Sequence, residues 1–152
     1  MLPETEAVDL QQKVTASGAD FLPVNPKGYV PALALDGGEL LTEGPAILQY
    51  IADQVPAKAL APANGSLDRY RLQGWLNFVG TELHKNFGAF FNPTAVPEWR
   101  AGAMAMLERR LGYLASEMEG RQYLMGDTFT VADCYLFTVL NWAGVIQLDL
   151  GR

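Results

Sequence analysis

Apolar residues recur at three- and four-residue steps through the second half of the chain, which is the spacing of an amphipathic helix. The first such run consists of Leu72, Leu76, Val79, Leu83 and Phe87. Ser66 or Asp68 is placed to cap its start, and Asn92-Pro93 ends it. The pattern therefore predicts one long helix from about residue 66 to residue 91.

Two further helices follow from the same spacing. The second begins near Pro97, stops around Glu119-Gly120, and has an apolar face made of Met104, Leu107, Leu111 and Leu114. Thr130 is positioned to cap a third helix. Everything from residue 66 to residue 152 is thus expected to form one all-helical domain.

The first 54 residues follow a different, mixed pattern. Leu2 to Val8 favours a weak strand, and Gln11 to Ser17 favours a short polar helix or a loop. The apolar run Ala32 to Leu35 ends at Asp36-Gly37, a strong hairpin signal, and Leu40-Leu41 supplies the second strand. This part is therefore expected to be a small α/β domain.

Glu43-Gly44-Pro45 opens a helix that the pattern extends to Asp53. Proline is tolerated in the first helical turn, where its missing N–H would have no partner in any case. The first backbone N–H groups of a helix point outward, so the donors of Gly44 and Ala46 suit an anion. Residues 55–65 are rich in Pro, Ala and Gly without any period, and are interpreted as a linker between the two domains.

Composition and charge restrict the function. The chain has 152 residues, 49% of them hydrophobic, and a net charge of -6, which argues against nucleic acid or an anionic membrane as a partner. No apolar run approaches the roughly 20 residues of a membrane span, and the first residues lack the pattern of a signal peptide, so a cytoplasmic protein is expected. The single cysteine, Cys134, excludes an internal disulfide and a cysteine-cluster zinc site, and no metal is expected.

Three blocks of sequence together resemble a known family. The first lies within Val24 to Ile51 and reads NPKGYVPAL, DG, LTEG and AILQYIAD; the second is LNFVGTELHKNF, residues 76–87; the third is GDTFTVADCYLF, residues 126–137. Their order and spacing resemble the glutathione S-transferases, most closely the bacterial beta class. The resemblance implies a thioredoxin-like N-terminal domain, an all-helical C-terminal domain, glutathione as co-substrate, and a homodimer active in detoxification.

The resemblance also implies binding residues in the first domain. The Val30-Pro31 peptide bond is cis in the family, which presents the backbone of Val30 to the cysteinyl unit of glutathione. Only about 5% of X-Pro bonds in folded proteins are cis, so the residues alone favour trans and the resemblance favours cis. Glu43 and Gly44 match the γ-glutamyl site, where many relatives carry a serine in place of Gly44, and Lys13 matches a lysine that reaches the glycyl carboxylate. Without the resemblance, Glu43 is equally well explained as a carboxylate that stabilises a helix start, and Lys13 as an ordinary solvated lysine.

A polar stripe on the first long helix supplies the remaining candidates, Asn77, Thr81, His84 and Lys85. In the family, the matching residues border the cleft between the domains and contact glutathione or its sulfur. His84 is the only histidine of the chain, and its pKa near 6.5 would let it polarise a thiol or donate a hydrogen bond to a thiolate. It is therefore the candidate catalytic residue; the alternative is a structural or solvated histidine.

Three other residue types are assigned structural roles. Thr130 and Asp133 have the spacing of a capping box, so the carboxylate is expected to serve the helix's own first turn. Cys134 is interpreted as a small buried hydrophobe, with a reactive thiol as the minority alternative. The tryptophans Trp75, Trp99 and Trp142 are interpreted as core or interface residues.

The resemblance predicts that parts of the family fold are missing. The chain begins at what matches the second strand of the family fold. A strand and a helix of about 20 residues are therefore expected to be absent from the thioredoxin-like domain. The last helices of the all-helical domain are expected to be absent as well. In the family, the missing first segment carries the Cys, Ser or Tyr that stabilises the thiolate. Two functions stay open: a transferase that conjugates glutathione to electrophilic apolar substrates, or a non-catalytic ligand-binding or dimerisation module.

Overall fold

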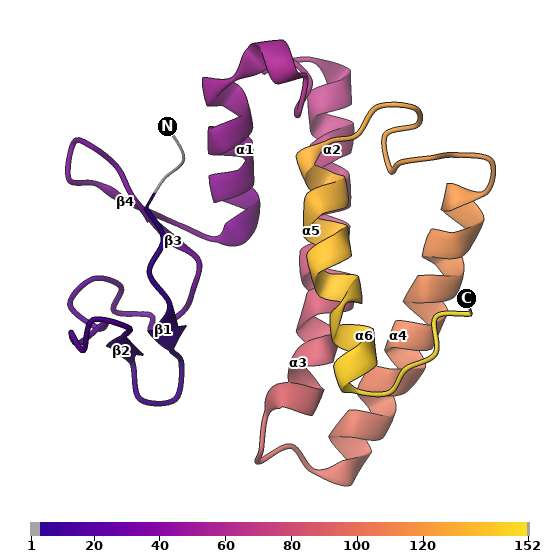
Figure 1. Cartoon of the computed structure of the whole chain (residues 1–152). Helices are drawn as coiled ribbons and strands as arrows, with labels where there is room; N and C mark the ends of the chain where they lie inside the picture. Colours follow the sequence, from indigo (N-terminus) through magenta and orange to yellow (C-terminus); the bar gives the residue numbers. More distant parts are fainter. Residues whose placement is uncertain (1–3, 152) are drawn as a thin grey trace. The chain divides into compact units, whose positions relative to one another are not determined.

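The computed structural model describes residues 4–151 (Figure 1). Contacts within the chain group it into two compact units, Met1–Tyr50 and Ile51–Arg152. The first holds the strands and most of the first helix, and the second is helical.

The first unit opens with a short antiparallel hairpin of β1 (Val8–Asp9) and β2 (Val14–Thr15). The Asp9 carboxylate accepts hydrogen bonds from the backbone N–H groups of Gln11 and Gln12, at 2.8 and 3.0 Å, and Lys13 turns the chain with a φ of 58°. The predicted helix or loop over Gln11 to Ser17 was therefore wrong where β2 forms. The predicted strand over Leu2 to Val8 was also wrong for residues 4–7, and Leu2 lies outside the described residues.

A second hairpin pairs β3 (Ala32–Ala34) with β4 (Leu40–Thr42) and places Leu33 opposite Leu41. This confirms the hairpin prediction, although the residue that adopts a positive φ is Gly38, at 84°. Helix α1 (Gly44–Gln54) follows β4 directly and begins within one residue of the predicted start. Its Ile47 is buried, which gives the helix an inward face.

The second unit begins with the short 3-10 helix η1 (Pro56–Lys58) and is built around one continuous helical rod. The rod consists of α2 (Leu67–Phe78), the π-helical turn η2 (Val79–His84) and α3 (Lys85–Phe91). Ser66 caps the rod by accepting a 3.1 Å hydrogen bond from the N–H of Arg69. All five predicted core positions of the rod are at most 1% exposed, which confirms its apolar face: Leu72, Leu76, Val79, Leu83 and Phe87.

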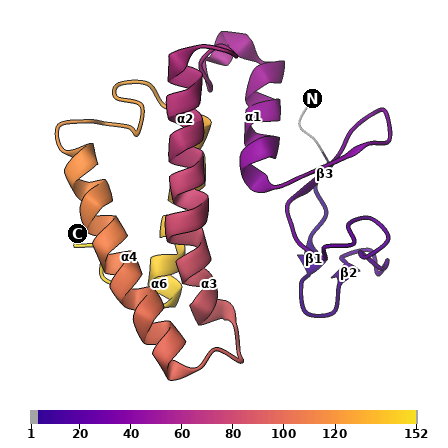
Figure 2. The ribbon, with the colours of Figure 1, turned by 180° about the vertical axis from the view of Figure 1, so that it is seen from behind.

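The remaining helices pack against this rod, as the two opposite views in Figures 1 and 2 show. Helix α4 (Pro97–Met118) lies against η2 and α3, and α5 (Val131–Leu140) lies against α2 and η2. The short α6 (Trp142–Val145) continues from α5. The observed bounds of α4 and α5 agree with the predicted starts at Pro97 and Thr130. None of the helices in the described part of the chain is long and apolar enough to cross a membrane.

The irregular residues that precede α2 are attached to the helical unit by polar contacts. The guanidinium of the buried Arg69 donates two hydrogen bonds to the Asp53 carboxylate, at 2.9 and 2.6 Å, and one of 2.8 Å to the Pro62 carbonyl. The N–H of Val131, at the start of α5, donates to the Leu60 carbonyl at 2.9 Å. These contacts fix the path of the chain between α1 and α2.

Candidate functional site

The loop that leads into β3 is shaped by a buried asparagine. The Asn25 side chain donates a 2.8 Å hydrogen bond to the Tyr29 carbonyl and accepts one of 3.2 Å from the N–H of Lys27. The Val30-Pro31 peptide bond that follows is cis, as the family resemblance predicts. Val30 is 45% exposed, and its backbone forms no hydrogen bond with another described residue. The loop therefore presents a free backbone donor and acceptor at its surface.

Glu43 and Gly44 form the start of α1. Glu43 has a φ of 71°, and its carbonyl accepts hydrogen bonds from the N–H groups of Ala46 and Ile47, both at 3.0 Å. The expectation that the donor of Ala46 is free for a ligand was therefore wrong, because the turn at the helix start already uses it. The N–H of Gly44 has no partner among residues 4–151 and remains available.

The Glu43 carboxylate is paired with Lys27, a residue that the sequence indicated only as part of a turn. Lys27 Nζ lies 2.7 Å from Glu43 Oε1 and 3.1 Å from Thr42 Oγ1. Both charged side chains are more than half exposed, at 51% and 69%, so the pair contributes at most about 1 kcal/mol and a ligand ammonium can compete for the carboxylate.

Lys13 packs against the same loop. Its ammonium donates a 2.9 Å hydrogen bond to the Gly28 carbonyl and lies 5.8 Å from the centre of the Tyr29 ring. Gly28 has a φ of 65°, which favours glycine, and a Cβ atom there would lie 3.1 Å from Lys13 Cε, a tight contact with the lysine side chain. Because a lysine has three donors, Lys13 can hold the loop and still bind a carboxylate.

The four candidates of the helical unit lie on α2, η2 and α3, and all four are exposed: Asn77, Thr81, His84 and Lys85. The Thr81 hydroxyl donates a 3.0 Å hydrogen bond to the Asn77 carbonyl. The sequence predicted an uninterrupted α-helix here, but the backbone N–H of Lys85 donates to the Gly80 carbonyl five residues earlier. This wider turn rotates His84 and Lys85 relative to Asn77, so the regular α-helical stripe that the spacing predicted was wrong in detail.

His84 is held by two aromatic residues that the sequence analysis did not connect with it. Its Nδ1 atom lies 2.8 Å from the hydroxyl oxygen of Tyr135, and its ring meets the Trp142 ring edge-on, with centroids 4.7 Å apart and planes at 82°. Although the residue as a whole is exposed, this partial burial of the ring lowers the pKa of His84 from its ordinary value. At neutral pH the imidazole is therefore mainly uncharged.

Asp133 and Cys134 serve the helical fold. One Asp133 oxygen accepts a 2.8 Å hydrogen bond from the Thr130 N–H, which completes the predicted capping box, and the other accepts one of 2.8 Å from the Leu124 N–H. Burial, together with the nearby Asp133 charge, raises the pKa of the Cys134 thiol. A thiol with a raised pKa is a weak nucleophile, which agrees with the structural role predicted for it.

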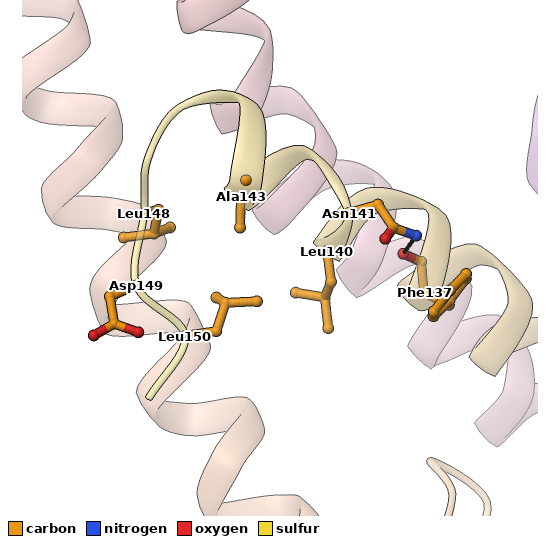
Figure 3. Close-up of a pocket in the computed structure, with 8 residues that line it drawn as sticks. Phe137, Leu140, Asn141, Ala143, Leu148, Asp149 and Leu150 are labelled. Carbon is orange, nitrogen blue, oxygen red and sulfur yellow. Dashed lines mark hydrogen bonds between the residues drawn. The ribbon is translucent and has the colours of Figure 1, made fainter. Parts of the chain in front are cut away.

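A hollow of about 520 Å³ in the helical unit lies between α5, α6 and residues 148–150 (Figure 3). Its walls are mostly apolar, with Phe137, Leu140 and Leu150 facing it, while the Asn141 side chain is turned to the Phe137 carbonyl. None of the predicted site residues lines this hollow. Among residues 4–151, no three His, Cys, Asp or Glu side chains are grouped so that they could hold a metal ion.

Comparison with protein families finds matches to two stretches of the chain. The family model described as glutathione S-transferase, N-terminal domain, matches residues 2–54. The model described as glutathione S-transferase, C-terminal domain, matches residues 97–151. Both halves of the chain are therefore similar to the same kind of protein.

Individual relatives agree with this assignment. Glutathione S-transferase GstA of Escherichia coli O157:H7 is 46% identical over 95% of this chain and 72% of its own length. The structure of a sphingomonad glutathione S-transferase complexed with glutathione has a TM-score of 0.90 at 50% identity and covers 95% of this chain and 72% of that one. A bacterial beta class glutathione S-transferase from Sphingomonas chungbukensis covers the same shares at a TM-score of 0.91 and 47% identity. With a small N-terminal sheet domain, a helical C-terminal domain and relatives of this similarity, the chain belongs to the glutathione S-transferase family and is similar to its bacterial beta class.

Proposed function

We propose that this chain binds glutathione through the residues described above and acts as a glutathione transferase on electrophilic apolar substrates. One observation carries the proposal: the exposed backbone of Val30 and the free N–H of Gly44 belong to neighbouring parts of one compact unit. Pro31 Cγ lies 3.7 Å from the position that a Cβ atom would take at Gly44, so the loop and the helix start are in contact. A ligand that pairs with Val30 is then close to the anion site of α1.

The first unit offers complementary groups for three parts of glutathione. The Val30 backbone can pair with the cysteinyl unit in the manner of an added strand. The Gly44 N–H, at the positive end of α1, can bind the α-carboxylate of the γ-glutamyl unit, while Glu43 accepts its ammonium. Lys13 retains donors for the glycyl carboxylate. The Glu43 carboxylate is an acceptor next to the Gly44 N–H donor. This pair of groups suits the zwitterionic γ-glutamyl unit better than a simple anion.

The role assigned to His84 is a hydrogen bond to the glutathione sulfur. A mainly uncharged imidazole keeps one N–H group, and a donor of this kind stabilises a thiolate relative to a thiol. Asn77, Thr81 and Lys85 are assigned polar contacts with glutathione, because they are exposed on the same helical rod. The thiolate is the nucleophile that attacks the electrophile, since the thiol form reacts far more slowly.

Three further properties belong to the proposal. A role in detoxification follows from the proposed reaction, which attaches a polar tripeptide to an apolar electrophile. The cytoplasm is the proposed location, since a reduced glutathione pool is maintained there. Homodimerisation is supported by exposed apolar side chains on α2, where Leu67 and Tyr70 are 65% and 60% exposed. The same helix contributes Trp75 and Phe78 to a hollow of about 260 Å³. Light scattering on the purified chain measures the mass directly.

The function is tested by retention on immobilised glutathione, followed by an assay with a chlorodinitrobenzene-type electrophile. We expect retention, elution with free glutathione, and turnover above the uncatalysed rate. Binding without turnover would indicate the alternative, a ligand-binding module without catalysis. Absence of retention would refute the proposal that this chain binds glutathione.

A further inference from the structure

The hydroxyl group of Tyr135 and the imidazole of His84 form a contact that none of the proposed binding roles requires. The two residues are 51 positions apart and come from α5 and η2, yet Tyr135 Oη lies 2.8 Å from His84 Nδ1. The Trp142 ring stands edge-on to the same imidazole, at 4.7 Å between centroids. One ring nitrogen is therefore engaged by a hydroxyl group, and the ring plane is restricted by an indole.

Tyr135 contacts a glycine of the π-helical turn. A Cβ atom at Gly80 would lie 3.6 Å from Tyr135 Oη and 3.8 Å from Tyr135 Cε1, so the tyrosine passes directly over a glycine of η2. Both distances are ordinary van der Waals contacts, so Tyr135 packs directly on this turn. The position of Tyr135 is thus set by packing against the same turn that carries His84.

Two directions of this hydrogen bond are compatible with a neutral imidazole: Nδ1 can accept a proton from the hydroxyl group, or it can carry the proton and donate to the hydroxyl oxygen. Burial favours the neutral imidazole, which has one N–H group and one nitrogen that accepts. A tyrosine hydroxyl group has one O–H that can donate, and this is the direction that we assign here. The acidic side chain on the same turn, Glu82, is occupied by Arg110, at 2.6 Å between Oε2 and Nε. Among the described residues, no carboxylate therefore competes with Tyr135 for His84 Nδ1.

We propose that Tyr135 is a positioning residue that donates its hydroxyl proton to a hydrogen bond with His84 Nδ1 and so holds the imidazole as the tautomer protonated on Nε2. In this tautomer Nε2 is a donor. It has no hydrogen-bond partner within residues 4–151, and it lies on the opposite side of the ring from Tyr135. His84 then acts on a bound sulfur by donating a hydrogen bond to the thiolate, and it does not remove the thiol proton through Nε2. The part of this inference that concerns sulfur rests on the proposed function, whereas the tautomer does not.

The single histidine of the chain allows a direct test. The ring-nitrogen NMR spectrum of the ¹⁵N-histidine-labelled full chain, recorded at a pH about two units above 6.5, contains this residue alone. We expect a pyridine-like Nδ1 resonance and a pyrrole-like Nε2 resonance. In Tyr135→Phe, which keeps the ring and loses the hydroxyl group, we expect the two resonances to move toward each other as the tautomers exchange. Tyr123→Phe is the matched control, because its half-buried ring packs on Phe129, at 5.5 Å between centroids, whereas His84 Nδ1 contacts the hydroxyl group of Tyr135.

Two results would overturn the inference. One is a pyrrole-like Nδ1 in the unmodified chain, and the other is a spectrum of Tyr135→Phe that is identical to that of the unmodified chain. Addition of glutathione then tests the sulfur contact separately. A shift of the Nε2 resonance that S-methylglutathione reproduces only weakly supports a hydrogen bond to sulfur. No shift with either ligand, combined with the expected tautomer, would refute glutathione binding next to His84 and leave the role of Tyr135 in place.

Discussion

Pro31 and Gly44 are in contact across the first unit, with Pro31 Cγ 3.7 Å from the position that a Cβ atom would take at Gly44. Pro31 is the second residue of the cis peptide bond, and Gly44 is the first residue of α1. A distance of 3.7 Å is ordinary van der Waals contact, so the space can accept a small side chain without displacement of the proline. The loop that contains Val30 and Pro31 and the start of α1 at Gly44 are therefore adjacent parts of one candidate binding surface.

This geometry predicts that Gly44→Ser is tolerated and strengthens glutathione binding. A serine hydroxyl at the start of α1 would add one hydrogen bond to the ligand carboxylate, worth about 0.5–1.5 kcal/mol, or roughly a 2- to 12-fold lower Kd. Isothermal titration with glutathione measures the change, and Gly44→Ala is the control that adds the Cβ atom without the hydroxyl group. Equal affinities of the serine and alanine variants would show that no carboxylate is bound at this helix start.

Neutralising Glu43 should weaken glutathione binding. In Glu43→Gln the side chain keeps its length but loses the charge that we assign to the ligand ammonium, at a cost of about 1.5–3 kcal/mol, roughly ten- to hundredfold in Kd. The matched control is Glu39→Gln, which removes an exposed carboxylate from the neighbouring hairpin turn. If both variants bind glutathione equally well, Glu43 is only a helix-start carboxylate paired with Lys27.

The Asp53–Arg69 pair should be important for the stability of the helical unit. The Arg69 side chain is only 4% exposed and that of Asp53 is 34% exposed, so Asp53→Asn leaves a buried guanidinium without its counter-charge. We expect the free energy of unfolding to fall by about 2–3 kcal/mol, below the range for a fully buried pair because Asp53 is partly solvated. Urea denaturation at neutral pH measures this.

A second ion pair on the same helix provides the control. Asp68 and Arg71 lie 2.7 Å apart, but both side chains are 62% exposed, so Asp68→Asn should cost less than about 1 kcal/mol. Similar losses in Asp53→Asn and Asp68→Asn would contradict the structural role given to Arg69.

The stability of the chain should fall in mild acid because of His84. Burial lowers the pKa of His84 below 6.5, so the unfolded chain binds this proton more readily than the folded chain does. The contribution of His84 is therefore complete above about pH 6.5 and is lost as the pH falls toward the lower folded-state pKa. His84→Gln should flatten the dependence of unfolding free energy on pH in this interval.

The carboxylates change the free energy of unfolding at lower pH than His84 does. The effect of His84 on stability can therefore be measured separately. Hydrogen bonds from Arg69 lower the pKa of Asp53, and hydrogen bonds from backbone N–H groups lower that of Asp9. Their stabilisation is present above the ordinary pKa of an aspartate, near 3.8, and is lost as the pH falls through the lowered values. An unchanged slope between about pH 7 and pH 5 in His84→Gln would mean that the imidazole titrates alike in the folded and unfolded chains.

The features that the sequence predicted well depend on local chemistry. Asp36-Gly37 marks a hairpin, Pro45 fits a first helical turn, and Thr130 with Asp133 forms a capping box, each within a few residues. The sequence also predicted the apolar face of the helices from α2 to α3, because the buried residues of a packed helix recur at three- and four-residue spacing.

Other features depend on conformations or contacts that local patterns do not specify. Lys13 adopts a positive φ, which closes the β1–β2 hairpin in a segment that appeared polar and helical, although the Asp9 side chain could have signalled a turn. The π-helical turn at Val79–His84 inserts one residue into the helical period while leaving the apolar face intact. The contact between His84 and Tyr135 arises only when α5 packs on η2, so residues 51 positions apart gave no sign of it.

Glutathione binding by the first unit is the central claim, and an amide NMR titration of the full chain tests it most directly. Glutathione is added to the ¹⁵N-labelled chain up to about 10 mM, well above the usual range of substrate KM values. We predict saturable shifts of the Val30 and Gly44 amides, with a common Kd that rises in Glu43→Gln. Unchanged Val30 and Gly44 amides over the whole titration would contradict the account.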